Sequence, residues 1–81
     1  MTEREQKKRA NFARLFTARV EKNREQLRVI GNCSNKTNYE WNENQVRLAF
    51  GLLIREYIST ARLFGIEIEA QVNGIDVRTL D

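Results

Sequence analysis

Apolar residues recur at every third or fourth position through the first part of the chain. They fall at Ala13, Phe16, Val20, Leu27 and Ile30, with Phe12 beside them. This spacing predicts one apolar stripe on one face of a helix. Thr2 and Glu5 form a capping-box pattern at its start, and Gly31 is expected to end it in a left-handed conformation. We therefore expect a helix over residues 3–30.

A second stripe with helical spacing follows a polar segment. Asn42 and Gln45 have the spacing of a capping pair, and Trp41 and Val46 flank them in the two positions of a hydrophobic staple. The stripe consists of Val46, Phe50, Leu53, Ile54, Tyr57, Ala61 and Phe64. Gly65 is expected to close the helix in a Schellman motif, with Ile66 placed to contact Ala61. We expect a loop over residues 31–42 and a helix over residues 43–64.

After Gly65 the apolar period changes to two. The alternating residues are Ile66, Ile68, Ala70 and Val72, then Ile75, Val77 and Thr79 after Asn73-Gly74. Asn-Gly between alternating runs predicts a β-hairpin over residues 66–80. A two-residue turn pairs Val72 with Ile75, Ala70 with Val77 and Ile68 with Thr79 on one face. On the other face it pairs Glu69 with Arg78, which have opposite charges.

These elements predict an α+β fold, mainly α, in a single domain over residues 1–81: an antiparallel helical hairpin followed by a C-terminal β-hairpin. On the second helix, Leu48, Leu52 and Leu63 fall on the side opposite Phe50 and Tyr57. A helix that is apolar on two sides is usually covered on both. The β-hairpin could cover one side and a second copy of the chain the other, so we expect a homodimer with Leu48, Leu52 and Leu63 in its interface.

One polar residue interrupts the apolar stripe of the first helix. Asn23 lies between Val20 and Leu27. A single polar residue in an apolar seam often sets the register or the oligomeric state, and this adds Asn23 to the expected dimer interface. The alternative is that Asn23 bonds the loop or water, and both readings stay open.

Most catalytic chemistry is excluded by the residue inventory. The chain has no histidine and one cysteine, which rules out an internal disulfide and a zinc site of the Cys/His type. Cys33 therefore has no histidine to activate it, and Glu40 and Glu43 have the pattern of two solvated carboxylates. We expect no enzyme, no metal, no cofactor and no small-molecule substrate.

The hydropathy pattern bears on location. No uninterrupted apolar run is longer than the three residues 52–54, or the seven residues 48–54 if Gly51 is counted, and either is far too short to span a bilayer. The basic N-terminal segment has no apolar stretch behind it, so it does not have the pattern of a secretory signal. We expect a cytoplasmic protein without a membrane partner.

Charge is unevenly distributed and points to a partner. Residues 1–28 hold nine Lys and Arg against four acids, whereas residues 65–81 hold one against four. Cationic side chains neutralise phosphates, and aromatic side chains stack on bases. The residues expected to contact nucleic acid are Arg14, Arg19 and Lys22 of the first helix, and Lys36, Tyr39 and Trp41 of the loop.

Each part of this expectation has an alternative. The cations of the first helix could form an ordinary solvated face, because Lys7 and Arg14 share their side with Glu21 and Glu25. The loop aromatics could be structural, with Trp41 in the staple and Tyr39 closing the open end of the helical hairpin.

The loop carries a recognisable pattern. Gly31-Asn32, Ser34-Asn35, the run Asn38-Tyr39-Glu40-Trp41, and Gln45-Val46 stand between two helical segments. This pattern resembles small proteins of phages, plasmids and other mobile elements, over about residues 12–64. That group has no known activity. The resemblance therefore implies a genomic setting, in which small accessory proteins regulate replication or transfer or block host defence.

The expected function is a non-catalytic regulator of mobile-element origin that contacts nucleic acid. One alternative is a protein-binding inhibitor of host nucleoprotein machinery, for example of a CRISPR defence system. Another is a structural homo-oligomer without a ligand.

Overall fold

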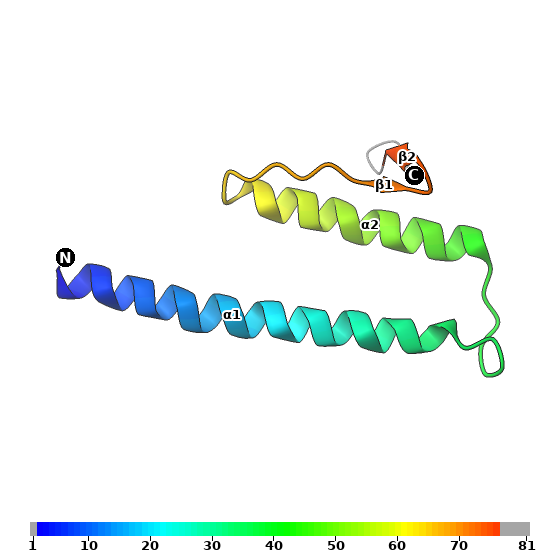
Figure 1. Cartoon of the computed structure of the whole chain (residues 1–81), viewed down its shortest axis with the longest axis horizontal. Helices are drawn as coiled ribbons and strands as arrows, with labels where there is room; N and C mark the ends of the chain where they lie inside the picture. The colour runs from blue at the N-terminus through cyan, green and yellow to red at the C-terminus, as the bar shows by residue number, and fades with distance from the viewer. Residues whose placement is uncertain (1, 77–81) are drawn as a thin grey trace. The chain divides into compact units, whose positions relative to one another are not determined.

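The computed structural model describes residues 2–76 and contains two long helices followed by a small antiparallel sheet (Figure 1). Its elements are α1 (Glu3–Gly31), the 3-10 helix η1 (Asn32–Ser34), α2 (Glu43–Arg62), β1 (Gln71–Val72) and β2 (Ile75–Asp76). The predicted order of elements and the mainly helical class are confirmed. The chain divides into two compact units, Met1–Tyr39 and Glu40–Asp81. The antiparallel packing of the two helices and the homodimer remain predictions.

The first unit is built on α1, which begins at the predicted cap. The Thr2 hydroxyl accepts a hydrogen bond from the Glu5 N–H at 3.2 Å. Glu3 and Glu5 in the first turn and Arg28 in the last turn have the signs that the helix dipole favours. Leu27 is half-buried and every other residue of α1 is exposed, so the helix contributes no buried residue.

The predicted left-handed ending of α1 at Gly31 is wrong. Gly31 has φ −59° and ψ −27°, which are right-handed helical values, and it is the last residue of α1. The chain then tightens into η1, and the Asn32 N–H donates to the Val29 carbonyl. A 3-10 turn satisfies the terminal carbonyls without a left-handed residue. A glycine permits the left-handed conformation but does not require it.

The loop after η1 is organised by Asn35. Its side-chain oxygen accepts from the Thr37 N–H at 2.9 Å, and its carbonyl accepts from the N–H groups of Asn38 and Tyr39 at 3.2 and 3.0 Å. Short polar side chains that bond their own backbone are typical of turns. The loop therefore holds a defined shape through bonds within residues 35–39.

The second unit begins with the predicted start of α2. The Asn42 side-chain oxygen accepts from the Gln45 N–H at 2.8 Å, and the Gln45 side-chain oxygen accepts from the Asn42 N–H at 3.1 Å. This reciprocal capping box confirms the prediction. Trp41 and Val46, the two staple positions, are both half-buried.

The end of α2 is also as predicted, apart from its last two residues. Gly65 has φ +74°, the Ile66 N–H donates to the Ala61 carbonyl at 3.0 Å, and the Gly65 N–H donates to the Arg62 carbonyl at 2.9 Å. These two bonds define a Schellman motif. The regular helix ends at Arg62 rather than at residue 64, because the closing turn takes up the remaining residues.

The tail after Gly65 returns along α2 and ends in the predicted turn (Figure 1). Asn73 and Gly74 have φ +50° and +83°, as a type I′ turn requires. Val72 pairs with Ile75 as predicted, and Gln71 pairs with Asp76. The strand expected from residue 66 begins only at Gln71. The expected pairs of Ala70, Ile68 and Glu69 fall on Val77, Thr79 and Arg78, which lie outside the described residues.

The tail covers one row of α2, which forms the core of this unit. The row has the heptad-like spacing of Arg47, Gly51, Ile54, Ile58 and Ala61. Gly51 is buried, and Ile58 is only 4% exposed. Both ends of the row are fixed to the tail. Ala61 accepts from Ile66, as above, and with the Asn73 amide oxygen facing the guanidinium, Arg47 Nε and Nη2 donate to it at 2.8 and 3.1 Å.

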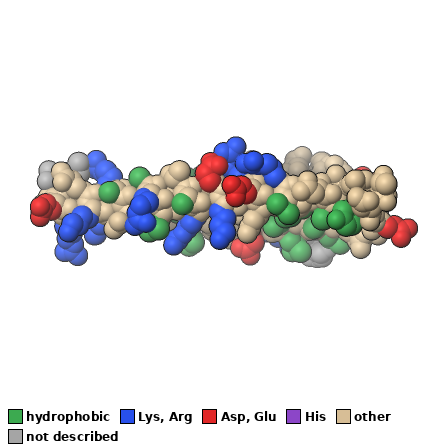
Figure 2. Space-filling model, turned by 90° about the horizontal axis from the view of Figure 1, so that it is seen from below, with side chains coloured by type: hydrophobic (Ala, Val, Ile, Leu, Met, Phe, Trp, Pro, Cys, Tyr) green, Lys and Arg blue, Asp and Glu red, His purple; other side chains and the backbone are tan. Residues whose placement is uncertain are grey.

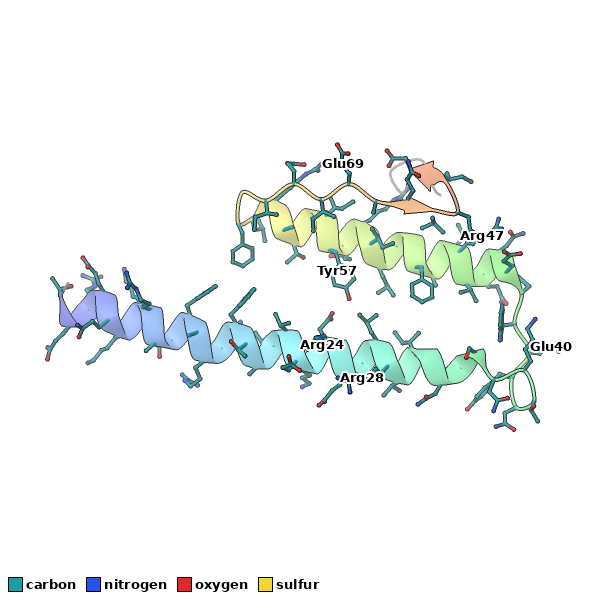
Figure 3. The ribbon with its side chains drawn as sticks, viewed as in Figure 1. Arg24, Arg28, Glu40, Arg47, Tyr57 and Glu69 are labelled. Atoms are coloured by element: carbon teal, nitrogen blue, oxygen red, sulfur yellow. The ribbon has the colours of Figure 1, made fainter. Side chains whose placement is uncertain are left out.

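Sequence reasoning identified this row only in part: Ile54 and Ala61 belong to the predicted stripe, whereas Arg47, Gly51 and Ile58 do not. Ile58 was not part of the predicted apolar stripe, whose members Phe50, Tyr57 and Phe64 are exposed. Of the predicted inner face of the hairpin, Ala70 and Val72 are half-buried, while Glu69 points away from α2 (Figure 3). The expected alternation is therefore present at residues 70–72, whereas Ile66, Ile68 and Ile75, which were predicted for the same face, are exposed.

Candidate nucleic-acid interface

One row of residues along α1 contains cations and no carboxylate. At 3.6 residues per turn, a single row on this helix contains Arg4, Lys8, Leu15, Arg19, Lys22 and Gln26. We call it the basic row. All six residues are exposed. Figure 2 shows that Lys and Arg side chains gather over the end of α1 that bears the N-terminus. The basic row therefore offers four cations to solvent along one line.

The opposite side of α1 mixes both signs of charge. Arg24 Nη1 forms an ion pair with Glu21 Oε1 at 2.9 Å. Arg14 lies on the same side as Glu21 and Glu25, and its Nη2 donates to Asn11 Oδ1 at 3.5 Å. Arg24 and Arg28 project from this helix in Figure 3. Nearby carboxylates lower the local positive potential, so this side is the poorer phosphate-binding surface.

The predicted cations of α1 thus divide into two groups. Arg19 and Lys22 lie on the basic row, whereas Arg14 does not. Sequence reasoning missed Arg4 and Lys8, which complete the row. The signal was present in their spacing, because residues 4, 8, 19 and 22 return to one side of a helix after each whole number of turns.

The loop residues Lys36 and Tyr39 belong to the same unit as the basic row. Tyr39 is 53% exposed, and Lys36 is exposed. Lys22 precedes the end of α1 by nine residues, so the loop lies roughly 14 Å further along the helix axis. Any single ligand that contacts both the basic row and the loop must therefore be extended.

Trp41 differs from Tyr39 in its surroundings. It is half-buried, it directly precedes the Asn42 cap, and it belongs to the second unit. Glu40, the first residue of that unit, is exposed (Figure 3). These features favour the structural alternative for Trp41 and leave Tyr39 as the aromatic side chain available for stacking.

Replacing the two aromatics by alanine tests this division. We expect Trp41→Ala to lower the free energy of unfolding by about 1–2 kcal/mol. Truncating a fully buried aromatic side chain to alanine costs roughly 3–5 kcal/mol, and a half-buried one costs part of that. Tyr39→Ala is expected to stay within about 0.5 kcal/mol. Urea denaturation followed by circular dichroism measures both. Equal destabilisation by the two variants would contradict the division.

The apolar stripe of α1 lies beside the basic row. The rings of Phe12 and Phe16 stack with centroids 4.8 Å apart, and both residues are exposed. Asn23 is exposed within the same stripe. Its assignment to a dimer interface remains a prediction.

The residues predicted for the dimer interface on α2 form an exposed face. Leu48, Leu52 and Leu63 are 42%, 59% and 86% exposed. Tyr57 points away from the tail on another side of the helix (Figure 3). The three leucines therefore lie outside the surface that the tail covers.

The described residues contain neither a cluster suited to a metal ion nor a helix suited to crossing a membrane. Among residues 2–76, no cluster of three or more cysteine or carboxylate side chains is arranged to hold a metal ion. Within the same residues, neither helix combines the length and the hydropathy needed to cross a membrane. Cys33 is exposed in η1 as a free thiol.

Comparison of the chain with protein-family models, with curated proteins and with solved structures finds no significant match.

Proposed function

We propose that this protein is a non-catalytic regulator that binds nucleic acid through the basic row of α1. The observation that carries the proposal is the row itself: Arg4, Lys8, Arg19 and Lys22 lie on one side of a helix without a carboxylate in the same line. Phosphate contacts by Lys and Arg supply most of the affinity of non-specific nucleic-acid binding. A line of cations along one helix is a simple surface that provides such contacts.

The length of the row matches an extended phosphate backbone. Arg4 and Lys22 are 18 residues apart, or about 27 Å along the helix axis. This is the length of about eight base pairs of B-DNA. Arg4 and Lys8 can contact phosphates near one end of such a segment. Arg19 and Lys22 can contact phosphates near the other end.

The loop adds a second kind of contact. Tyr39 can stack on an unpaired base, and Lys36 can contact a phosphate near it. Stacking requires a base that is splayed from its neighbours, so a single-stranded or looped ligand uses both surfaces. Trp41 does not enter this contact, because its half-buried ring supports the start of α2.

A binding titration with two variants of equal charge tests the proposal. In the first variant Arg4, Lys8, Arg19 and Lys22 are replaced by glutamine. In the matched control, Lys7, Arg14, Arg24 and Arg28 are replaced instead, which removes the same charge from the mixed side of α1. We expect the first variant to lose binding to mixed-sequence DNA and RNA at low salt. The control is expected to keep most of the affinity.

Salt dependence provides the second readout. Four phosphate contacts predict a slope of about −3 to −4 in a plot of log K against log salt concentration. The wild-type affinity should then fall about a hundredfold between roughly 50 and 200 mM salt. The first variant is expected to show a shallower slope, measured by fluorescence anisotropy.

Absence of binding at low salt would overturn the proposal, and so would equal losses in the two variants. A protein-binding inhibitor of host nucleoprotein machinery would then be the better reading, because a mostly apolar protein interface has little salt dependence. The resemblance to phage and plasmid proteins supports a setting in mobile elements under either reading.

A further inference from the structure

The turn at the tip of the β-hairpin contains an asparagine followed by a glycine. Asn73 precedes Gly74, whereas none of the other asparagines of the chain is followed by a glycine. A glycine leaves its own backbone nitrogen unshielded by a side chain. Both residues are exposed, and a Cβ atom added to Gly74 would meet no other atom within 4 Å. Water and hydroxide therefore have access to this pair.

Deamidation is the reaction open to such a pair. Hydroxide removes the proton of the Gly74 nitrogen, which then attacks Cγ of Asn73 and forms a new C–N bond. The carboxamide nitrogen takes a proton from water and leaves as ammonia, so that a succinimide ring remains. Water then opens the ring at either carbonyl, which leaves aspartate or isoaspartate. The net reaction consumes water, releases ammonia and needs no oxidant or cofactor.

The folded turn keeps the reacting atoms apart. Asn73 has φ +50° and Gly74 has φ +83°, as in a type I′ turn. In that turn the first central residue has ψ of about +30°, which places the next nitrogen on the far side of the Cα–C bond from Cβ. Attack requires the reacting atoms to lie roughly 3–3.5 Å apart. The Gly74 nitrogen reaches Cγ only after ψ of Asn73 rotates, and that rotation opens the turn.

Arg47 holds the Asn73 side chain in this unreactive arrangement. Arg47 lies at the end of α2 next to the hairpin (Figure 3), and its Nε and Nη2 donate to the Asn73 amide oxygen at 2.8 and 3.1 Å. Glu43 Oε1 accepts from the same guanidinium group at 2.8 Å and fixes its orientation. Hydrogen bonds to the amide oxygen also make Cγ more electrophilic. This does not speed the reaction while the nucleophile is out of reach.

We propose that Asn73 is a deamidation site, protected while the tail lies on α2 and modified when the tail lifts away. Arg47 is a positioning residue, because it acts by holding the Asn73 side chain and the hairpin on α2. Lifting the tail breaks its hydrogen bonds to Asn73 and frees the ψ rotation that attack needs. The rate of modification therefore follows the fraction of chains in which the tail is open. The inference goes beyond the proposed function and does not depend on it.

The products of the reaction have different effects on the turn. Aspartate leaves the main chain as it was, and Asp-Gly suits the same type I′ turn. Its carboxylate remains beside the Arg47 guanidinium group, where an ion pair replaces the neutral contact. Isoaspartate carries the main chain through Cγ and adds a methylene group to the turn, which shifts the pairing of Val72 with Ile75. A tail that has formed isoaspartate therefore cannot return to its original register, and its release is one-way.

Incubation at mildly alkaline pH, followed by peptide mapping with mass spectrometry, measures the loss of Asn73. We expect this loss to be about tenfold or more slower in the folded chain than in urea, because a slow reaction of an open state tracks the population of that state. The other asparagines in the same peptide map serve as internal references. Equal rates at Asn73 with and without urea would overturn the proposal.

Arg47→Met tests the role of the guanidinium group, because methionine keeps a flexible unbranched side chain and removes the donors. We expect deamidation of the folded chain to become about fivefold or more faster, and the rate in urea to stay the same. Arg24→Met is the matched control. Arg24 also pairs with a glutamate on its own helix, Glu21 at 2.9 Å, but it belongs to the other unit. An unchanged rate in Arg47→Met, or equal acceleration in both variants, would overturn the assignment of Arg47.

The stability of the purified products tests the one-way release. Ion-exchange chromatography separates the deamidated chains, and Trp41 fluorescence in a urea titration then compares the isoaspartate form with the Asn73→Asp variant. We expect the isoaspartate form to unfold at a lower urea concentration, because its turn no longer fits the hairpin. Equal midpoints would show that the modified tail still docks, and would overturn this part of the proposal.

Discussion

Replacing Ile58 by alanine is expected to lower the free energy of unfolding of the second unit by about 2–4 kcal/mol. Ile58 is the most deeply buried apolar side chain among the described residues, at 4% exposure, and it lies on the row that the tail covers. Removing its outer carbons leaves a cavity between α2 and the tail. Small domains bury little surface in total, so this loss is a large part of their stability.

The measurement can use the single tryptophan of the chain. Trp41 directly precedes α2, so its fluorescence in a urea titration reports on this unit. Leu63→Ala is the control, because Leu63 is of similar size but 86% exposed. All proteins are compared at a concentration at which they are monomeric, so that a dimer interface does not contribute. We expect that variant to stay within about 0.5 kcal/mol of the wild type. A similar loss in both variants would mean that burial under the tail does not hold this unit together.

Two glycines at helix ends are expected to respond to alanine with opposite signs. Gly65 has φ +74°, where a Cβ atom is strained, so Gly65→Ala should cost about 1–2 kcal/mol. Gly31 has φ −59°, where alanine is the better helix former, so Gly31→Ala should stabilise by roughly 0.5–1 kcal/mol. At neither position does an added Cβ meet another atom within 4 Å. The difference therefore comes from backbone conformation alone.

Thermal unfolding of the two variants beside the wild type tests this pair. The melting temperature should fall for Gly65→Ala and rise for Gly31→Ala. A stabilised Gly65→Ala variant would mean that the Schellman turn is not the stable end of α2 in solution.

Local signals were sufficient to predict the ends of α2 and the turn of the hairpin. The Asn42–Gln45 box, the Gly65 closure and the Asn73-Gly74 turn each depend on residues within about six positions of one another. Their chemistry permits few alternatives, so the sequence identifies them. The end of α1 was wrong because a glycine is compatible with both helical hands, and the sequence does not show that a 3-10 turn satisfies the last carbonyls.

The other members of the core row, Arg47, Gly51 and Ile58, were missed for a different reason. Large aromatic side chains at Phe50, Tyr57 and Phe64 make their side of the helix look the most apolar in the sequence. The row under the tail looks less apolar, because it contains an arginine and a glycine. Arg47 is accommodated on this row because its guanidinium group is hydrogen-bonded. It donates to the Asn73 side-chain oxygen and to Glu43 Oε1, the latter at 2.8 Å. Such a row becomes apparent only when the path of the tail is known.

The candidate interface was predicted in part. Arg19, Lys22, Lys36 and Tyr39 were chosen from charge and residue type, and all four are exposed. The sorting of cations into a row without carboxylates and a side with both signs of charge follows from helix geometry and needed no structure. The half-burial of Trp41 could be seen only in the structure. In the sequence, a tryptophan that packs in a hydrophobic staple looks the same as one that stacks on a base.

The path of the tail has a consequence for the order of events during synthesis. The side of α2 that holds Gly51 and Ile58 leaves the ribosome before residues 70–72, which later cover it. Until residues 70–72 pack against it, this side of α2 is an exposed apolar surface that chaperones or neighbouring nascent chains can bind.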